Sequence, residues 1–566
     1  MALNLVEAIQ DDRAVKEAGF AGVVFLTYTL NLRFYEQIIA PALDRAACAN
    51  ALIIADPDGY ADALQLGAMS ITGAGRRYVC VPLSCEGRGI QHVKLVLMAG
   101  AKYGRMLIGS GNLTLHGYGR NLELFSRFDL DVRDPDPEVY YAFAEVWGLL
   151  EKLDKNERLS GTACSQLAVM REKARWLTSS PPVPADFRVW HNYTEPIWKQ
   201  LSRWRADRGW DERPLRSLRL ISPYYDRDLG TLLQVTDDLQ PSTVGLYLGP
   251  SSTNLDMERL GAQWGGKSAD LHVSGIDSPE GSRWLHAKAI IGVEDGGAWC
   301  ITGSANVSRP ALLKSWSDGG NLELVTFRWS PDAEAFEPLW DDESVRVWTL
   351  QPEEIVATEE TSEGLQRTGT VIDLMELTAQ GQQLKGRISQ RPADAPSVGE
   401  LQLLRASASL PVEVTTEGRF ALELGQPLNE AEAARLVLGE YASPYRWIDQ
   451  PEVLAKFGAR TYHTRVRGQL ETFDGADKLF GELLNFLWER VDRTKIQEEA
   501  EQARKEVKLR LGPSGDARSG IEGEGPPAPP PGAFVTDEDL VTAIGWRGEQ
   551  QLPYDRHVLS LRDLFS

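Results

Sequence analysis

One pattern of residues occurs twice in this chain, and it constrains the fold more than any other feature of the sequence. The first copy, residues 92–124, begins His-Val-Lys and contains Gly-Ser-Gly-Asn, and the second, residues 286–324, begins His-Ala-Lys and contains Gly-Ser-Ala-Asn. In both copies the asparagine lies 20 residues after the histidine, and both copies end in Asn-Leu-Glu-Leu. Equal spacing and a shared ending indicate an internal duplication, so we expect two homologous halves.

Each copy is predicted to contain two strands joined by a turn. The histidine and lysine are followed by apolar runs, LVLM in the first copy and AII in the second. This pattern predicts a strand whose alternation directs the histidine and the lysine to one face. The runs RMLIGSGN and WCITGSAN predict a second strand ending in a turn of small residues. That turn would bring the serine and the asparagine beside the His–Lys pair.

These side chains suit chemistry at phosphorus. Lysine and asparagine donate hydrogen bonds to phosphoryl oxygens, and a neutral histidine can act as a nucleophile or as a general acid or base. Two facing copies would supply one histidine to attack phosphorus and another to protonate the leaving oxygen, with reactive nitrogens within about 6 Å. The lysines and asparagines would stabilise the transition-state charge, a role that Mg²⁺ has in other enzymes.

A duplicated His-x-Lys with a downstream Gly-Ser-x-Asn resembles the signature of the phospholipase D superfamily. In that family one histidine forms a covalent phosphohistidine and the other protonates the leaving group. The resemblance implies two α/β halves related by a pseudo-twofold axis, and a phosphodiesterase with no metal and no cofactor. It assigns catalytic roles to His92, Lys94, Asn112, His286, Lys288 and Asn306, and supporting roles to Ser110, Ser304, Glu123 and Glu323, the glutamates as groups that orient the histidines.

The sequence departs from the common family pattern at two positions. Many members carry an aspartate five residues after the lysine, where this chain has Ala99 and Val293. In this respect it resembles the tyrosyl-DNA phosphodiesterase branch and some nucleases. The resemblance therefore favours a DNA nuclease or DNA-end-processing enzyme, in a bacterial antiphage defence or repair system, with a helicase or translocase ATPase as a partner. The alternatives are a phospholipase or phosphatidyl transferase, and a non-catalytic module that binds nucleic acid or protein.

Composition narrows these alternatives. The net charge of −21 argues against a protein that coats nucleic acid without specificity, and it would repel anionic lipid surfaces. The first 15 residues lack the apolar core of a secretory signal, and no run approaches the roughly 18 apolar residues that span a bilayer, so we expect a cytoplasmic protein. The cysteines show no C-x-x-C spacing and predict neither a zinc site nor a disulfide framework: Cys48, Cys80, Cys85, Cys164 and Cys300.

The order of predicted elements gives the domain organisation. A strand at 21–30, a helix at 34–49 and a strand at 51–59 predict a βαβ unit. Helices are also expected at 1–20, 137–153 and 197–207, and a strand at 216–226. The predicted segments are a first half at 1–185, a second half at 186–350, a linker at 351–367, a β-sandwich-like module at 368–450, a helical region at 451–511, a Gly/Pro-rich linker at 512–533 and a C-terminal segment at 534–566. The oligomeric state is left open.

Several residues near the motifs have two interpretations. The aromatic residues near the second copy could stack a nucleobase, but burial in the core is the favoured role: Tyr224, Tyr225, Trp284, Trp299 and Trp316. His116 is expected to lie exposed in a loop. Four cationic residues could extend a phosphate-binding track or could lie in solvated loops: Lys102, Arg105, Arg309 and Lys314.

Overall fold

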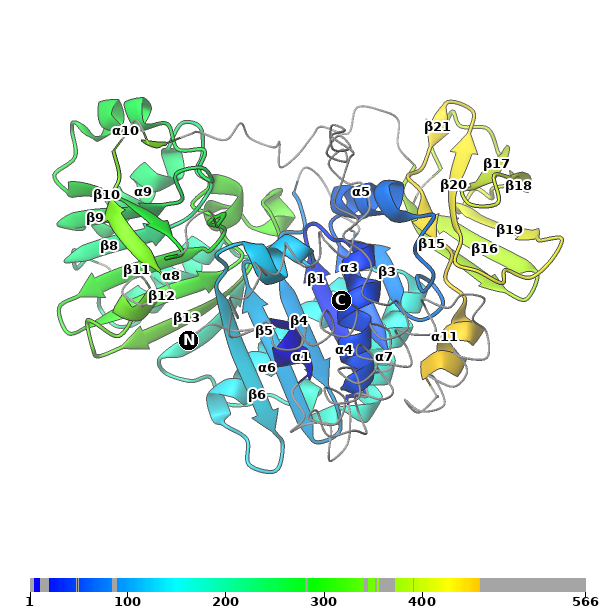
Figure 1. The fold of residues 1–566 in the computed structure, drawn as a ribbon, viewed down its shortest axis with the longest axis horizontal. Coiled ribbons are helices and arrows are strands. Elements are labelled where there is room, and N and C mark those ends of the chain that lie inside the picture. The colour runs from blue at the N-terminus through cyan, green and yellow to red at the C-terminus, as the bar shows by residue number, and fades with distance from the viewer. Residues whose placement is uncertain are drawn as a thin grey trace, which may run out of the picture.

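A computed structural model gives the fold of most of the chain. It describes residues 5–10, 20–46, 48, 50–83, 89–210, 212–279, 283–339, 345–351, 354–355, 372–389 and 391–458. Figure 1 shows two large sheets side by side, with a smaller β module beyond the first of them. The predicted C-terminal elements beyond residue 458 and most of the predicted linker at 351–367 lie outside the described residues.

The first half is a six-stranded sheet with the order β3-β2-β1-β4-β5-β6. The first three strands run parallel, and β4, β5 and β6 continue the sheet antiparallel. The strands are β1 (Gly22–Thr27), β2 (Ala51–Ala55), β3 (Val79–Pro82), β4 (Leu95–Ala99), β5 (Tyr103–Gly109) and β6 (Phe125–Asp131).

The helices of the first half begin at residues suited to capping. Asp56 and Asp136 accept hydrogen bonds from the first backbone amides of α5 and α6, and a proline follows each of them. A continuous helical run joins β1 to β2, built from α3 (Leu32–Phe34), η1 (Tyr35–Ile39) and α4 (Ala40–Arg45). The others are α1 (Leu5–Gln10), α5 (Pro57–Gly67), η2 (His116–Arg120), α6 (Pro137–Lys155), α7 (Gly161–Lys173) and η3 (Arg175–Thr178).

The second half repeats the first. Its sheet has the order β14-β10-β9-β8-β11-β12-β13-β7, so β8 to β13 occupy the same relative places as β1 to β6. As in the first half, β8, β9 and β10 run parallel, and β11, β12 and β13 continue the sheet antiparallel. The strands are β7 (Phe187–His191), β8 (Ser217–Ile221), β9 (Thr243–Leu248), β10 (Asp270–Asp277), β11 (Ala289–Glu294), β12 (Gly297–Gly303), β13 (Leu324–Ser330) and β14 (Arg346–Thr349).

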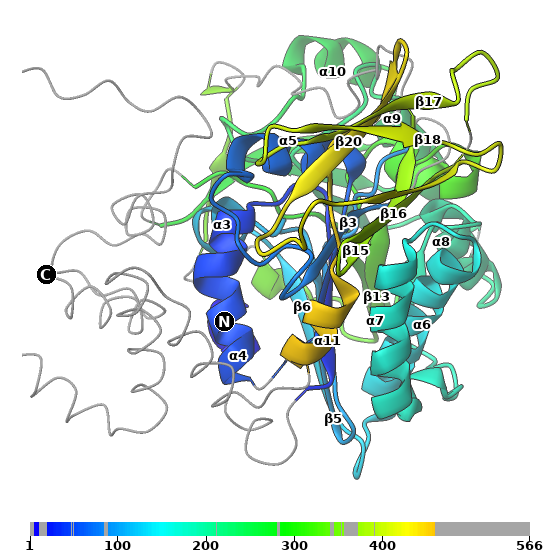
Figure 2. The same cartoon turned by 90° about the vertical axis from the view of Figure 1, so that its right-hand side faces the viewer.

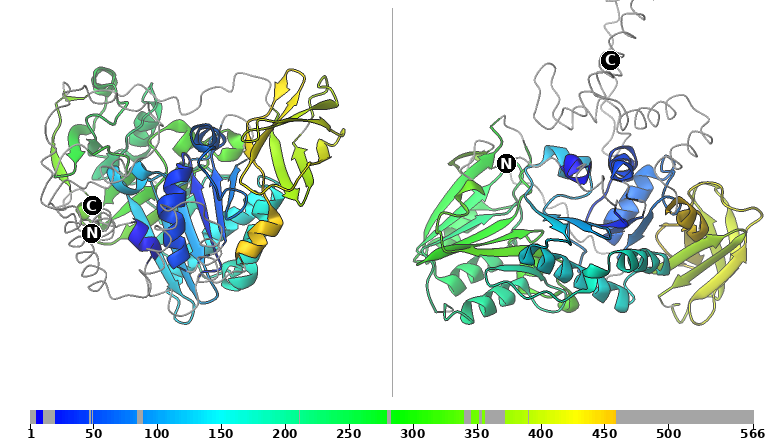
Figure 3. Two further views of the ribbon diagram at one scale, coloured as in Figure 1. Left: turned by 45° about the vertical axis from the view of Figure 1, so that its right-hand side comes forward. Right: turned by 90° about the horizontal axis from the view of Figure 1, so that it is seen from below.

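This repeated strand order confirms the predicted α/β fold of two homologous halves. The helices of the second half are α8 (Ile197–Ala206), α9 (Gly230–Leu239) and α10 (Met257–Trp264), with short turns η4 (Arg309–Leu313), η5 (Trp316–Asp318) and η6 (Glu337–Leu339). Figure 3 shows α6, α7 and α8 along one side of the two sheets. No helix in the described ranges is both long enough and apolar enough to cross a membrane.

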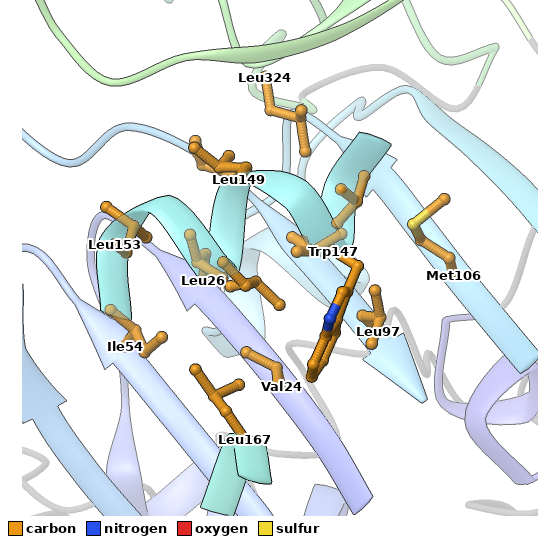
Figure 4. Close-up of a cluster of buried hydrophobic side chains, with 14 of the residues drawn as sticks. Val24, Leu26, Ile54, Leu97, Met106, Trp147, Leu149, Leu153, Leu167 and Leu324 are labelled. Atoms are coloured by element: carbon orange, nitrogen blue, oxygen red, sulfur yellow. The ribbon is translucent and has the colours of Figure 1, made fainter. Parts of the chain in front are cut away.

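Both faces of the first sheet are buried at its inner strands, which explains why β1, β2 and β4 are almost continuously apolar. Val24 and Leu26 of β1 pack into one cluster, and the intervening Val23 and Phe25 pack into another on the opposite face. Figure 4 shows the first of these clusters, where Trp147 of α6 packs against the sheet. The sheet is therefore held from two sides and forms a rigid support for the loops at its ends.

The β module consists of two small sheets that share one core, which confirms the predicted β-rich third region. Figure 2 shows it beside the first half. Trp447 N donates to Tyr60 Oη at 2.8 Å, and Gln450 N donates to Gly75 O at 2.7 Å, so the module is bonded directly to that half. Its elements are β15 (Leu374–Gln380), β16 (Gln383–Ile388), β17 (Val398–Leu403), β18 (Ser409–Glu413), β19 (Arg419–Glu423), β20 (Ala433–Leu438), β21 (Tyr441–Ala442), β22 (Arg446–Trp447) and α11 (Pro451–Gly458).

Several predicted elements differ in extent. The strand predicted at 51–59 ends at Ala55, and α5 begins at Pro57. Of the helix predicted at 1–20, the structure has α1 at Leu5–Gln10, and residues 11–19 lie outside the described residues. The helix predicted at 34–49 begins earlier, at Leu32, and ends at Arg45. The strand predicted at 216–226 ends at Ile221, because Pro223 cannot donate to a sheet ladder. The His-x-Lys residues precede β4 and β11 rather than lying within them, since the backbone amide of each histidine bonds to the other half of the molecule. The domain boundaries themselves stay predictions.

Gly75 provides a test of how the β module docks. Its φ is 73°, and a Cβ added there would lie 2.2 Å from Ile448 O of the module. Gly381, with φ 58° and no atom within 4 Å of such a Cβ, is a matched control. Both alanine variants incur about 1–2 kcal/mol for the left-handed conformation, but only Gly75→Ala also displaces the module. We expect a clearly larger fall in the thermal unfolding midpoint for Gly75→Ala, and equal falls would contradict this packing.

Candidate active site

Each His-x-Lys segment pairs with the Asn-Leu-Glu-Leu segment of the other copy. His92 N donates to Leu322 O at 3.0 Å, and Leu322 N donates back to the carbonyl two residues before the histidine, at 2.8 Å. The second copy makes the equivalent two bonds with the first. His286 N donates to Leu122 O, and Leu122 N donates to Trp284 O, both at 2.9 Å. The two halves therefore exchange short β-bridges, which place both histidine segments at one interface.

The glutamates of the motif are exchanged in the same way. His92 Nδ1 lies 2.9 and 3.0 Å from the two carboxylate oxygens of Glu323, and His286 Nδ1 lies 3.0 Å from both oxygens of Glu123. A carboxylate only accepts hydrogen bonds, so each Nδ1 carries a proton, and whenever the imidazole is neutral its Nε2 carries the lone pair. Each imidazole is thus oriented by the copy of the motif to which it does not belong.

The serine of each Gly-Ser turn holds the glutamate of its own copy. Ser110 Oγ donates to Glu123 Oε2 and accepts from Leu124 N at 3.0 Å. Ser304 Oγ donates to Glu323 Oε2 and accepts from the next backbone amide at 3.1 Å. The asparagine that begins each Asn-Leu-Glu-Leu segment also donates to the glutamate of that segment. The predicted supporting residues therefore form two equivalent networks around the two imidazoles.

Both motif lysines are buried at this interface. Lys94 is 1 % exposed and Lys288 is 2 % exposed. Each Nζ donates to the backbone carbonyl of its own histidine, at 2.8 Å for Lys94 and 2.6 Å for Lys288. Lys94 belongs to the first copy, yet its charge acts on His286 of the second. Two buried ammonium groups beside two imidazoles favour the binding of an anion.

The protonation of the second pair follows from its surroundings. Burial lowers the pKa of His286 to about 4, and Lys288 and Lys94 act in the same direction against the opposing effect of Glu123. Burial alone would raise the pKa of Glu123, but His286 and Lys288 outweigh it and hold that pKa below its ordinary value. At neutral pH the pair is therefore a neutral imidazole beside an ionised carboxylate, and Nε2 of His286 is available as a base or nucleophile.

The loops after β1 and β8 correspond residue by residue. Leu30 bridges to Leu113 in the first half, and Tyr225 bridges to Val307 in the second. Thr27 Oγ1 and the equivalent Ser222 Oγ each accept from the backbone amide that follows the motif asparagine. By this correspondence, Tyr28 of the first half is equivalent to Pro223 of the second.

That one difference makes the two motif asparagines unequal. Asn112 Oδ1 accepts from Tyr28 N at 3.2 Å and from Thr29 N at 3.4 Å. Pro223 has no N–H to offer, and the buried Oδ1 of Asn306 makes no hydrogen bond to the described residues. Asn112 is therefore fixed by two backbone amides, whereas the amide oxygen of Asn306 has no such bond within the described residues.

Sequence reasoning missed Tyr28. The centre of its ring lies 5.5 Å from the ring centre of His92 and 5.6 Å from Lys94 Nζ. The signal was available, because Tyr28 follows the first strand of a βαβ unit, and ligands bind at the carboxyl ends of such strands. It also missed Asn192, whose Oδ1 accepts from Glu323 N at 2.7 Å.

The residues with two interpretations have separate outcomes. Burial is confirmed for Tyr225, Trp299 and Trp316, and it is wrong for Trp284, which is 37 % exposed. Tyr224 is half-buried.

Among the charged residues near the motifs, Arg105 is neither a phosphate contact nor a solvated residue, because it is buried and paired with Asp129. Lys102 is exposed in the turn at the far end of β5 from the site, and Arg309, Lys314 and His116 are exposed.

Within the described ranges, no group of three or more His, Cys, Asp or Glu side chains is arranged to bind a metal ion. The ionisable side chains of the two motifs that lie at this interface are two lysines, two glutamates and two histidines.

The depressed pKa of His286 predicts a pH effect on stability. In the unfolded chain this histidine binds a proton below its ordinary pKa of about 6.5, while in the folded protein it stays neutral down to about pH 4. The unfolded state therefore binds more protons in this window, and stability falls as the pH falls from about 6.5 to 4. Thermal unfolding midpoints of the wild type and of His286→Asn should converge as the pH is lowered. A constant difference between them would contradict a neutral buried His286.

Known proteins similar to this chain are found among solved structures but not by sequence. No protein-family model matches the chain, and no curated protein matches it in sequence. Among the similar solved structures, yeast tyrosyl-DNA phosphodiesterase is 9% identical over 57% of this chain and 87% of that chain, with a TM-score of 0.38. Polyphosphate kinase from Porphyromonas gingivalis is 12% identical over 62% of this chain and 47% of that chain, with a TM-score of 0.35. Identity this low indicates nothing about the substrate.

Proposed function

We propose that this chain is a metal-independent phosphodiesterase that acts on DNA through a covalent phosphohistidine. The observation that carries the proposal is the exchange of carboxylates, with Glu323 on His92 and Glu123 on His286. It brings two imidazoles of the same tautomer to one interface, where two buried lysines supply positive charge. A phosphodiester is the anion that can use all of these groups in one reaction.

In the first step, Nε2 of one histidine attacks phosphorus. An N–P bond forms, the bond from phosphorus to the leaving oxygen breaks, and the second imidazole gives its Nε2 proton to that oxygen. The anionic substrate raises the pKa of the imidazole that serves as the acid, because a nearby negative charge favours the protonated form. Lys94 and Lys288 stabilise the charge on the non-bridging oxygens, and Asn112 can donate from Nδ2.

In the second step, water completes the hydrolysis. The imidazole that donated its proton now accepts one from a water molecule, whose oxygen attacks phosphorus as the N–P bond breaks. Both histidines return to their starting forms. The glutamates keep Nδ1 protonated throughout and stabilise the imidazolium that forms in each step.

DNA is the proposed substrate because of the form of the motif. The aspartate that many superfamily members carry after the lysine is replaced by Ala99 and Val293, which lie in β4 and β11 and are 0 % and 7 % exposed. In this the chain resembles nuclease members. A phospholipase remains the alternative for experiment to exclude. A helicase or translocase partner and a role in defence or repair stay predictions from the sequence.

Histidine variants test the two-histidine mechanism. His92→Asn and His286→Asn keep a donor for the partner glutamate but lose Nε2, so each should reduce cleavage of labelled DNA by at least about a hundredfold. His272→Asn is the matched control, because His272 is exposed on β10. It should retain full activity, and all three proteins should be folded at the temperature of the assay. Near-normal cleavage by either motif variant would contradict the mechanism.

A chelator tests the metal-independent part. Cleavage of labelled single-stranded and duplex DNA should be unchanged in excess EDTA, since Lys94 and Lys288 supply the positive charge. Phosphatidylcholine vesicles form the parallel arm of the assay. Strict dependence on added Mg²⁺ or Mn²⁺ would contradict the proposal, and hydrolysis of the lipid but not of DNA would favour the phospholipase alternative.

A further inference from the structure

Trp284 is an exposed aromatic residue fixed beside the candidate active site. Its side chain is 37 % exposed, and it lies two residues before His286. Its carbonyl accepts from Leu122 N at 2.9 Å, in the same β-bridge that positions the histidine. The backbone under the ring is therefore held by the interface between the two halves, although the ring itself is not packed in the core.

The first copy of the motif has no such ring. The residue equivalent to Trp284 is Ile90, whose carbonyl accepts from Leu322 N in the same way, and Ile90 is 7 % exposed. The histidines differ in the same direction, since the side chain of His92 is 1 % exposed and that of His286 is 11 % exposed. The site is therefore more open on the side of the second copy, where Trp284 lies.

The chemistry of an isolated exposed ring favours a planar ligand. Trp284 is the one aromatic residue among the large apolar side chains that are exposed in the described part of the chain; the others are Met69, Val183, Val347 and Val398. Each of these four lies in a different part of the sequence from Trp284. A single indole face suits a nucleobase, which stacks on aromatic side chains without sequence preference.

The spacing of the chain places such a base near the reacting phosphate. Residues two apart in the chain are at most about 7 Å apart, so Trp284 and His286 lie side by side at the interface between the two halves. A nucleotide whose phosphate lies at His286 can therefore set its own base, or the adjacent one, against the indole. Only a base with an open face can do so, which means one in a single strand or at a strand end.

We propose that Trp284 is a base-stacking residue that makes the site select a scissile phosphate next to an unpaired nucleotide. This inference rests on the proposed phosphodiesterase function and names its substrate class as single-stranded DNA or a frayed DNA end. Stacking binds the nucleotide before reaction and is the same in the transition state, so its loss acts on KM and leaves kcat unchanged.

The test compares Trp284→Ala and Trp284→Phe on labelled single-stranded DNA in EDTA. Trp284→Ala should raise KM roughly tenfold to a hundredfold with kcat within about twofold, and Trp284→Phe should restore most of the affinity. Met69→Ala is the control, because Met69 is 70 % exposed and lies after α5, away from the motifs. It should behave as the wild type, and thermal unfolding should show that all variants fold.

Abasic substrates separate stacking from a structural role. Oligonucleotides that lack the base on either side of the cleaved phosphate should show one position at which the wild type loses as much affinity as Trp284→Ala does on intact DNA. At that position Trp284→Ala should lose nothing further. Equal losses by Trp284→Ala on intact and abasic DNA, or wild-type cleavage of blunt duplex as efficient as that of single strands, would overturn the inference while leaving the proposed function standing. If the wild type cleaves no DNA, the proposed function fails, and this inference fails with it.

Discussion

The exchange of carboxylate–imidazole pairs between the two halves is the interaction on which the candidate site depends. Neither half can orient its own histidine, because the glutamate that holds His92 is in the second copy and the glutamate that holds His286 is in the first. The β-bridges at Leu122 and Leu322 set the register of both exchanges. A one-residue slip would turn each glutamate away from its histidine, so the interface must form as a unit. The first sheet, whose inner strands are buried on both faces, supports this interface.

The duplication is nearly symmetric in its networks and unequal at its surface. Serines, glutamates and lysines make equivalent bonds in both copies. The two copies differ in the loop after the first strand, where Tyr28 is equivalent to Pro223, and two residues before the histidine, where Ile90 is equivalent to Trp284. A reaction with an attacking and a leaving group needs two different environments at one phosphate. Substituting residues that touch the substrate, and keeping those that orient the histidines, can supply that difference without disturbing the interface.

Much of this could be predicted from the repeat. Equal spacing from histidine to asparagine indicated two homologous halves, and apolar runs with turn residues located most of the strands. The exchange of glutamates could not be predicted, because nothing in the spacing within one copy distinguishes Glu123 beside His92 from Glu123 beside His286. The sequence pattern also predicts strands at the His-x-Lys residues, because it does not show that the backbone amide of each histidine bonds to the other half. The usual burial of tryptophan predicts Trp284 in the core, but its exposure beside the site depends on tertiary structure.

The most direct measurement is a crystal structure of the protein with vanadate and a short DNA strand. The account predicts one vanadium atom bound between Nε2 of His92 and Nε2 of His286, which would lie within about 6 Å of each other. Lys94 and Lys288 should contact its equatorial oxygens, with the glutamates still exchanged between the halves. Vanadate bound by one histidine alone, with the other imidazole more than about twice that span away, would contradict a single composite site.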